Sequence, residues 1–146
     1  MTFATDFDGR WDLIMWSDDF AIGHAGIDDD HRRLLSLFNE FSMAVNAGKG
    51  SAIIRGVLDE LVDYTHYHFA REELMMLETQ YPEFLRHKKM HDTFIRQVDD
   101  VCHHLDVGSD LSAFLLSFLA KWLSGHILGA DRTLGRHLDR HGVVEH

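Results

Sequence analysis

Residues 84–105 read FLRHKKMHDTFIRQVDDVCHHL. Apolar and imidazole side chains recur in this segment at steps of three and four residues, which places them on one face of an α-helix. His87 and His91 lie four residues apart, so both rings can reach the same point from consecutive turns. The segment therefore predicts a core helix that carries two polar donors inward. Its inward positions are Phe84, His87, His91, Phe94, Val98, Val101 and Leu105.

Three further segments show the same helical period, and none alternates like a strand. Turn and helix-start signals separate them at residues 48–51, 81–82 and 108–110. Because short connections make consecutive helices antiparallel neighbours, we predict an all-α protein, an antiparallel up-down-up-down four-helix bundle over residues 28–135. Residues 1–27 are expected to form an N-terminal arm and residues 136–146 a short, loose C-terminal tail. The further inward positions are Leu34, Leu35, Phe38, Phe41 and Val45, then Ile54, Leu58, Leu61, Thr65, His68, Glu72 and Met75, then Leu115, Phe118, Leu119, Trp122 and His126.

Length and composition restrict the class of protein. The chain has 146 residues, one domain's worth, and its single cysteine, Cys102, excludes an internal disulfide framework. A net charge of −10 makes it a poor ligand for nucleic acid or anionic lipid. Residues 1–10 lack the apolar run of a secretion signal, and residues 113–123 are shorter than the ~20 residues of a membrane span. We therefore expect a cytoplasmic protein with no nucleic-acid or membrane partner.

Polar donors fall on the inward face of every predicted helix. There are 12 histidines, and histidine is the commonest metal-ligating side chain. His31 begins the first helix and His126 ends the fourth, while the second helix ends and the third begins with a donor pair. In an antiparallel bundle these four places lie at the same end, which is how bundles build metal sites in their cores. The donors are His31, His68, Glu72, His87, His91 and His126.

Asp131 joins this set only under a geometric condition. It follows His126 by five residues, which is about 140° around an ideal helix, so the two side chains do not share a face. They can converge if the helix forms a π-type turn near Gly129, a feature that often occurs at functional sites. The metal-site hypothesis therefore predicts a local departure from α-helical geometry there.

The donor chemistry favours two iron ions. Burying so many polar groups without a partner would cost several kcal/mol each, and five imidazoles with two carboxylates exceed one tetrahedral zinc and lack the oxygen-rich set of calcium or magnesium. Imidazole with carboxylate suits iron. Two octahedral ions offer twelve positions, of which five imidazoles, two bridging carboxylates and one bridging oxygen fill eleven. One open position on one iron is therefore expected.

The ordered set of motifs resembles the hemerythrin family, and most closely the single-domain bacterial hemerythrins. The resemblance covers roughly residues 16–135, and all seven positions of the family's ligand pattern are filled. Each short motif is weakly specific, whereas their order is highly specific. The motifs are Trp16-Ser17 with Phe20, Ile22, Gly23 and Ile27-Asp28 before His31; His68-Phe69-Ala70-Arg71-Glu72-Glu73 with Met76 and Tyr81-Pro82; His87-Lys88-Lys89-Met90-His91 with Phe94; and Trp122-Leu123-Ser124-Gly125-His126-Ile127 with Asp131.

This resemblance implies an activity and a role for each donor. His87, His91 and His126 would hold one iron and His31 and His68 the other, with Glu72 and Asp131 bridging beside an oxo or hydroxo group. Dioxygen would bind reversibly at the open iron, for transport or storage, without enzymatic turnover. Leu123 matches the family's leucine beside the oxygen pocket. The other candidates for a dry pocket wall are Phe38, Phe69, Trp122 and Ile127.

Several alternatives stay open at this point. The same site would also serve an oxygen or redox sensor that shifts its arm or tail against a protein partner, or an enzyme that reacts with peroxide or nitric oxide. The family often has glutamine where this chain has Asp30. This extra acid either alters the charge near the open iron or caps the first helix together with Asp28 and Asp29, and we expect capping. Tyr64 and Tyr67 either form hydrogen bonds among the residues that surround the ligands or only pack. His66 should face away from the site, and His137 and His141 lie past the bundle.

Overall fold

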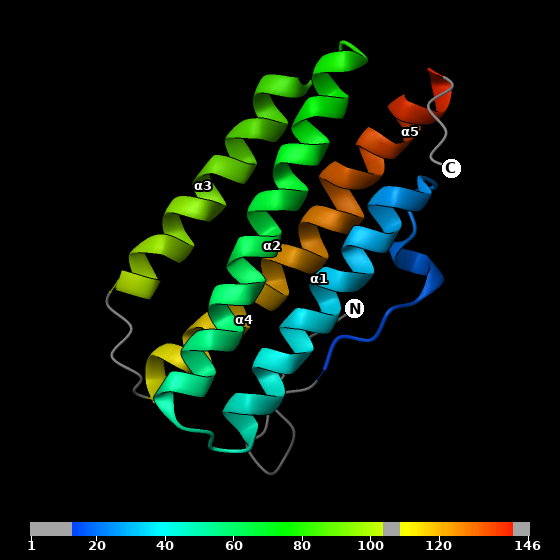
Figure 1. Cartoon of the computed structure of the whole chain (residues 1–146). Helices are drawn as coiled ribbons and strands as arrows, with labels where there is room; N and C mark the ends of the chain where they lie inside the picture. Colours follow the sequence, from blue (N-terminus) through cyan, green and yellow to red (C-terminus); the bar gives the residue numbers. More distant parts are fainter. Residues whose placement is uncertain (1–12, 104–108, 142–146) are drawn as a thin grey trace.

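The computed structural model describes residues 13–103 and 109–141, with the side chains of 109–111 excepted (Figure 1). These segments contain helices and no strand, which confirms the predicted all-α class. The fourth helix continues without a break from α4 through a π-helical turn, η2, into α5. The elements are η1 (Asp18–Phe20), α1 (Ala25–Asn46), α2 (Ser51–Glu78), α3 (Phe84–His103), α4 (Ser109–His126), η2 (Ile127–Asp131) and α5 (Arg132–Arg140).

The helices form the predicted antiparallel four-helix bundle. α1 packs against α2 and α4, and α3 packs against the same two helices, so each helix has two neighbours around one core (Figure 1). The core is apolar along most of its length because the inward positions of all four helices interdigitate there. Fully buried members include Phe38, Phe41, Leu58, Leu115 and Leu116.

The first helix begins earlier than expected, and its three acidic residues do not cap it. His24 is the N-cap, where its Nδ1 accepts a hydrogen bond from the amide of Ile27 at 3.2 Å. Asp28 accepts instead from the amide of Ile22 at 2.8 Å and so fixes the incoming chain. Asp30 lies inside the helix and is buried. The prediction that these residues cap the helix is therefore wrong, because His24, four residues before Asp28, supplies the cap.

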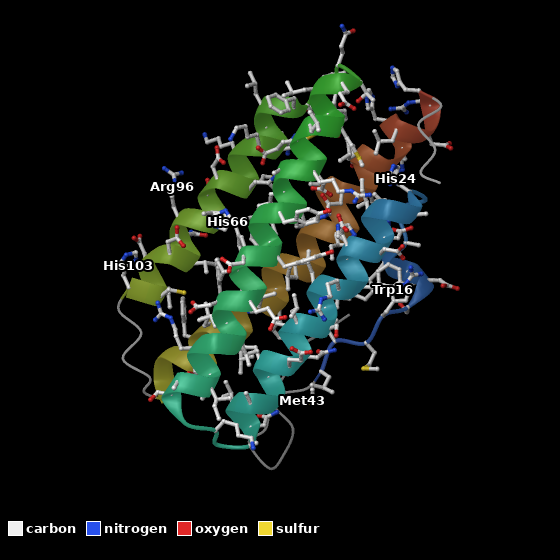
Figure 2. The ribbon with its side chains drawn as sticks, viewed as in Figure 1. Trp16, His24, Met43, His66, Arg96 and His103 are labelled. Atoms are coloured by element: carbon white, nitrogen blue, oxygen red, sulfur yellow. The ribbon has the colours of Figure 1, made fainter. Side chains whose placement is uncertain are left out.

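The described part of the arm packs onto the bundle. Ile14 and Phe20 are 1% exposed and belong to the main core. The amide and carbonyl of Ile14 both hydrogen-bond to the side-chain amide of Asn39 on α1, at 2.8 and 2.9 Å. Trp16 lies beside α1 with the Arg32 guanidinium 4.5 Å from its ring (Figure 2). Residues 1–12 of the predicted arm lie outside the described segments.

The tail prediction is wrong for residues 136–140. They are helical, because α5 runs to Arg140 and presents an apolar face to the chain before α1. Leu138 is fully buried and His137 is 3% exposed. The Nε2 of His137 donates to the carbonyl of Thr79 at 3.2 Å, which ties α5 to the end of α2. Residues 142–146 of the tail, and residues 104–108 of the turn before α4, lie outside the described segments.

By length and composition alone, the helix over Ser112–Arg140 is apolar enough to cross a membrane. Within the bundle, one face of this helix is buried against its neighbouring helices. That face also carries His126 and Asp131 inward. The apolar character of the helix is therefore accounted for by its position in the core, as expected for a bundle helix.

Candidate metal centre

All seven predicted donors converge in one buried layer of the bundle. His31 lies on the first turns of α1, the pair on α2 lies near its C-terminal end, and the pair on α3 lies near its N-terminal end. His126 ends α4. The antiparallel arrangement brings these four places to the same height. None of the donors is more than 7% exposed: His31, His68, Glu72, His87, His91, His126 and Asp131.

The predicted helix irregularity lies where the geometry required it. Residues Ile127–Asp131 form a π-helical turn between α4 and α5. A π-turn closes its hydrogen bonds between residues five apart, so it brings residue i+5 onto the face of residue i. Asp131 Oδ1 consequently lies 3.0 Å from Nε2 of His126, five residues before it. The π-turn is therefore what brings Asp131 to the site.

Three imidazoles form the first donor group. Nε2 of His126 lies 3.1 Å from Nε2 of His91 and 3.1 Å from Nε2 of His87. Two imidazole nitrogens each about 2.1 Å from one transition-metal ion lie roughly 3.0 Å apart when they meet it at a right angle, and roughly 3.4 Å apart in a tetrahedron. The observed separations match the right angles of an octahedral ion better than a tetrahedral zinc site.

His31 and His68 form the second group with the same two carboxylates. Nε2 of His31 lies 2.9 Å from Asp131 Oδ2, and Nε2 of His68 lies 3.2 Å from Glu72 Oε2. The donor atoms of each group lie within 4.8 Å of one another, and Glu72 and Asp131 belong to both groups.

Each carboxylate directs one oxygen to each group. Glu72 Oε1 lies 3.2 Å from Nε2 of His91, whereas Oε2 of the same carboxylate faces His68. Asp131 Oδ1 lies 3.0 Å from Nε2 of His87, whereas Oδ2 faces His31. Two carboxylates shared in this manner can bridge a pair of ions. The structure thus separates the seven donors into a three-histidine group and a two-histidine group.

The carboxylates and imidazoles of the cluster stabilise each other's charged forms. Burial alone would lower the pKa of His68, but the Glu72 carboxylate and the hydrogen bond to Asp30 raise it to about 10. Burial also opposes protonation of His87, but the adjacent carboxylates of Asp131 and Glu72 raise its pKa to about 9. Burial favours the neutral forms of Glu72 and Asp131, yet the surrounding imidazoles hold both pKa values well below their usual range. Both carboxylates are therefore ionised at neutral pH, and a metal that binds here must displace protons from imidazoles.

The hydrogen bonding of the cluster is incomplete without a further group. Nε2 of His31, Nε2 of His68 and both carboxylate oxygens of Glu72 are buried with no well-formed hydrogen bond. Such orphaned polar atoms are costly in a protein interior. These atoms face common points and do not form hydrogen bonds with one another. The donor set therefore fits metal ions.

Comparison with known proteins now identifies the fold family. Residues 23–138 match the family model of the hemerythrin HHE cation binding domain. The chain belongs to the hemerythrin family. This confirms the resemblance noted in the sequence, and the His/Glu/Asp cluster fits the metal site of such a domain.

Individual relatives cover most of the chain. The bacteriohemerythrin of Stenotrophomonas maltophilia (strain R551-3) is 37% identical over 129 residues, which are 88% of this chain and 84% of that protein. The bacteriohemerythrin of Pseudomonas aeruginosa (strain LESB58) is 38% identical over 118 residues, covering 81% of this chain and 76% of that protein. A crystal structure of a hemerythrin point mutant superposes with a TM-score of 0.72 at 27% identity, covering 86% of this chain and 97% of that chain.

Aromatic side chains cover the cluster of this hemerythrin domain. The Phe69 ring stacks on His91, with centroids 3.8 Å apart and planes 3° apart. Trp122 stacks on His126 at 4.3 Å. Leu123, the predicted oxygen-pocket leucine, is 2% exposed and belongs to the apolar core. These contacts restrict water at the three-histidine group and fix the planes of two imidazoles.

Two carboxylates outside the donor set hydrogen-bond to donor histidines, and neither hydrogen bond was predicted from the sequence. Nδ1 of His68 donates to Asp30 Oδ2 at 2.8 Å, and Nδ1 of His91 donates to Glu73 Oε2 at 3.0 Å. Tyr64 donates to the second oxygen of Asp30 at 3.1 Å, which selects the hydrogen-bonding alternative for this residue. Each carboxylate adjoins a ligand in the sequence, and that adjacency was the available signal.

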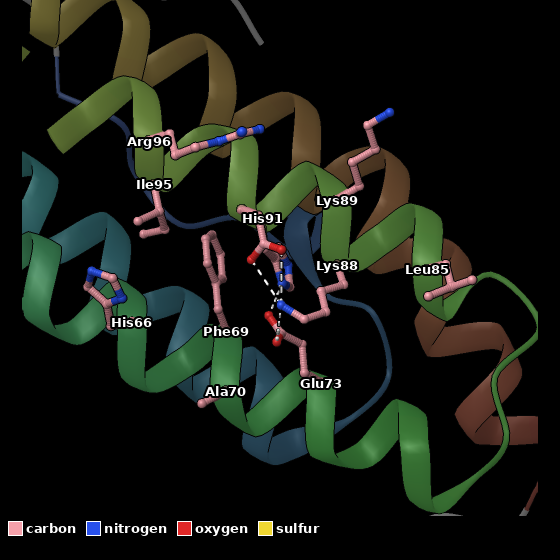
Figure 3. Close-up of a pocket in the computed structure, with 11 residues that line it drawn as sticks. His66, Phe69, Ala70, Glu73, Leu85, Lys88, Lys89, His91, Ile95 and Arg96 are labelled. Atoms are coloured by element: carbon pink, nitrogen blue, oxygen red, sulfur yellow. Dashed lines mark hydrogen bonds and ion pairs between the residues drawn. The ribbon is translucent and has the colours of Figure 1, made fainter. Parts of the chain in front are cut away.

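The three-histidine group lies beneath a surface groove of the hemerythrin domain. The groove, of about 710 Å³, opens between α2 and α3 (Figure 3). Phe69 and His91 lie on its inner side, and the Lys88 ammonium spans Glu73 and Asp92 at 3.6 and 3.0 Å (Figure 3). Glu73 therefore contacts both His91 and the Lys88 ammonium on this solvent-facing side.

The remaining histidines within the described segments lie away from the cluster. His66 is exposed on the surface of α2, as predicted. His103 and Arg96 project outward from α3 (Figure 2). His137 is committed to Thr79, and the Nδ1 of His141 donates to the carbonyl of His137 at 2.9 Å. His104 and His146 lie outside the described residues.

Proposed function

We propose that this hemerythrin domain binds dioxygen reversibly at a pair of iron ions, as an oxygen carrier or store. His87, His91 and His126 would hold one iron and His31 and His68 the other, with the two carboxylates bridging. The observation that carries the proposal is the division of each carboxylate between the two histidine groups. When bound, the iron pair supplies the electrons that dioxygen takes up and returns.

The protein's own residues favour reversible binding. Five neutral imidazoles stabilise the ferric state less than a carboxylate-rich set would, so electrons are returned more readily. The side-chain donors supply nine of twelve octahedral positions, and one bridging oxygen would fill two more. One position then stays free for one exogenous ligand. Phe69, Trp122 and Leu123 limit the access of water and protons, which would otherwise promote irreversible oxidation.

Anaerobic reconstitution tests this function directly. The purified chain is loaded with ferrous iron, exposed to air and then placed under vacuum, with absorption spectra and metal analysis at each step. We expect two irons per chain and a charge-transfer band that appears in air and disappears under vacuum. One iron per chain, or zinc displacing iron in native preparations, would contradict the proposal.

One contact favours an alternative function, an oxygen or redox sensor using the same site. η1 of the arm packs against η2, and the Arg132 guanidinium donates to the carbonyl of Asp19. Because η2 carries Asp131, a displacement of this carboxylate would be transmitted to residues 13–24. That coupling would give the metal site an output at the surface.

Autoxidation and hydrogen exchange separate the two functions. A carrier should autoxidise slowly and show the same amide exchange over residues 13–24 in its oxidised and reduced forms. A sensor should autoxidise within minutes and change exchange over that segment. Many turnovers of peroxide or nitric oxide per cluster would instead identify an enzyme, contrary to both.

A further inference from the structure

The ligand histidines differ in what holds the ring nitrogen that faces away from the cluster. In the two-histidine group, Nδ1 of His68 lies 2.8 Å from Asp30 Oδ2. In the three-histidine group, Nδ1 of His91 lies 3.0 Å from Glu73 Oε2. A carboxylate on this nitrogen fixes the tautomer, orients the ring and strengthens the other nitrogen as a metal donor. Each half of the cluster therefore has one reinforced imidazole.

The two outer carboxylates differ in their surroundings. The Asp30 side chain is 7% exposed, whereas that of Glu73 is 20% exposed and faces the groove. A charge acts more strongly on its neighbours when it is shielded from water. Glu73 also lies 3.6 Å from the Lys88 ammonium, which is itself 41% exposed. Water and Lys88 consequently screen the effect of Glu73 on His91 more than the effect of Asp30 on His68 is screened.

Asp30 has partners of its own that set how much charge it directs to His68. The Tyr64 hydroxyl donates to Oδ1 at 3.1 Å, and Nε of Arg71 lies 3.6 Å from Oδ2. A hydrogen bond to a carboxylate draws electron density toward the donor, so Tyr64 acts against the donation from Asp30 to His68. Tyr64, Asp30 and His68 form a chain that runs from the outer side of α2 to the cluster.

We propose that Asp30 is a positioning residue that lowers the reduction potential of the two-histidine half of the cluster through His68, and that Tyr64 moderates this effect. The inference rests on the iron pair proposed above and deepens it. It assigns control of redox behaviour to a residue that donates nothing to the metal directly. Glu73 exerts the same kind of effect on His91, more weakly.

The test is the reduction potential of the reconstituted iron pair, measured by spectroelectrochemistry. Asp30→Asn keeps the shape of the side chain and removes its charge, so the potential should rise, by a tenfold change in the oxidised-to-reduced ratio or about 59 mV for one electron. Tyr64→Phe leaves Asp30 its full charge, so the potential should fall. Glu73→Gln should raise it by less than Asp30→Asn. Asp30→Asn should also weaken iron binding by roughly 10-fold or more, because it removes the hydrogen-bond partner of a metal-binding histidine.

Asp29→Asn is the matched control. Asp29 adjoins Asp30, carries the same charge, is 74% exposed and pairs with Arg32 on the surface. This variant should leave the potential unchanged, because water screens its charge. If the role of Asp30 were merely structural, Asp30→Asn and Tyr64→Phe would shift the reduction potential in the same direction.

The outcomes distinguish this inference from the proposed function. Equal potentials for Asp30→Asn and Asp29→Asn, or shifts of the same sign for Asp30→Asn and Tyr64→Phe, would overturn the inference even if the oxygen band is reversible. A wild-type chain with two irons, an irreversible band and the expected shifts would overturn the carrier function and support the inference. A wild-type chain that binds no iron would overturn both.

Discussion

Glu72→Ala should empty both halves of the metal centre at once. Glu72 is fully buried at the centre of the cluster and directs one oxygen to each histidine group, so no other residue replaces it at either ion. Its loss should weaken iron binding by more than the roughly 10- to 100-fold that loss of an outer hydrogen-bond partner costs. We expect iron content after reconstitution to fall from two per chain to well under one, with no charge-transfer band in air.

Three further variants make this result specific. Glu78→Ala removes an exposed carboxylate from the end of the same helix and should bind two irons as the wild type does. His126→Ala should also abolish the band, because it removes a ligand of the three-histidine group, whereas His141→Ala should leave the band intact. Normal iron content in Glu72→Ala, or equal effects of the two histidine variants, would mean that the ligands are assigned incorrectly.

Gly135→Ala should destabilise the fold strongly, although alanine is the better helix former. Gly135 lies in α5, where an added Cβ would overlap the carbonyl oxygen of Ile22 and lie 3.0 Å from its Cβ. That carbonyl is backbone in a segment fixed by the hydrogen bond from Ile22 to Asp28, so it cannot move aside cheaply. Overpacking of this kind costs about 1–3 kcal/mol, and urea unfolding of the metal-free chain should show it as a lower midpoint.

Gly56→Ala provides the opposite expectation within the same chain. Gly56 lies inside α2, is exposed, and would have nothing within 4 Å of an added Cβ. Replacing a glycine in an open helix interior with alanine should stabilise the protein by about 0.5–1 kcal/mol. If both variants moved the midpoint upward, the close packing of α5 against the chain before α1 would be refuted.

Helical periodicity was enough to predict the bundle and the donor layer. An inward stripe of the type carried by Phe94 and Val98 must be buried, and stripes on four helices joined by short turns are buried in few ways. Donor pairs at a spacing of four residues then have a fixed height along their helix. The condition placed on Asp131 was also local, since five residues from His126 demand a turn wider than an α-helical one. The structure contains that turn.

Other features depend on neighbours that are remote in the sequence. Asp30 was expected to cap a helix, yet it reaches His68 on α2, because His24 provides the cap and α1 begins earlier. Residues 136–140 read as a polar tail, yet Leu138 and His137 bind the chain before α1 and the end of α2. In both cases the sequence shows a polar or weakly periodic segment whose partner is chosen only when the helices pack.

The sequence by itself determined which side chains are available as donors and at what height along each helix they lie, because helical rise and rotation per residue are constants of the backbone. Only the tertiary structure decided which carboxylate oxygen faces which histidine group, and which ring nitrogens receive Asp30 and Glu73. Those choices depend on the rotation and separation of neighbouring helices, and these are set by packing across the whole core and not by any local run of residues.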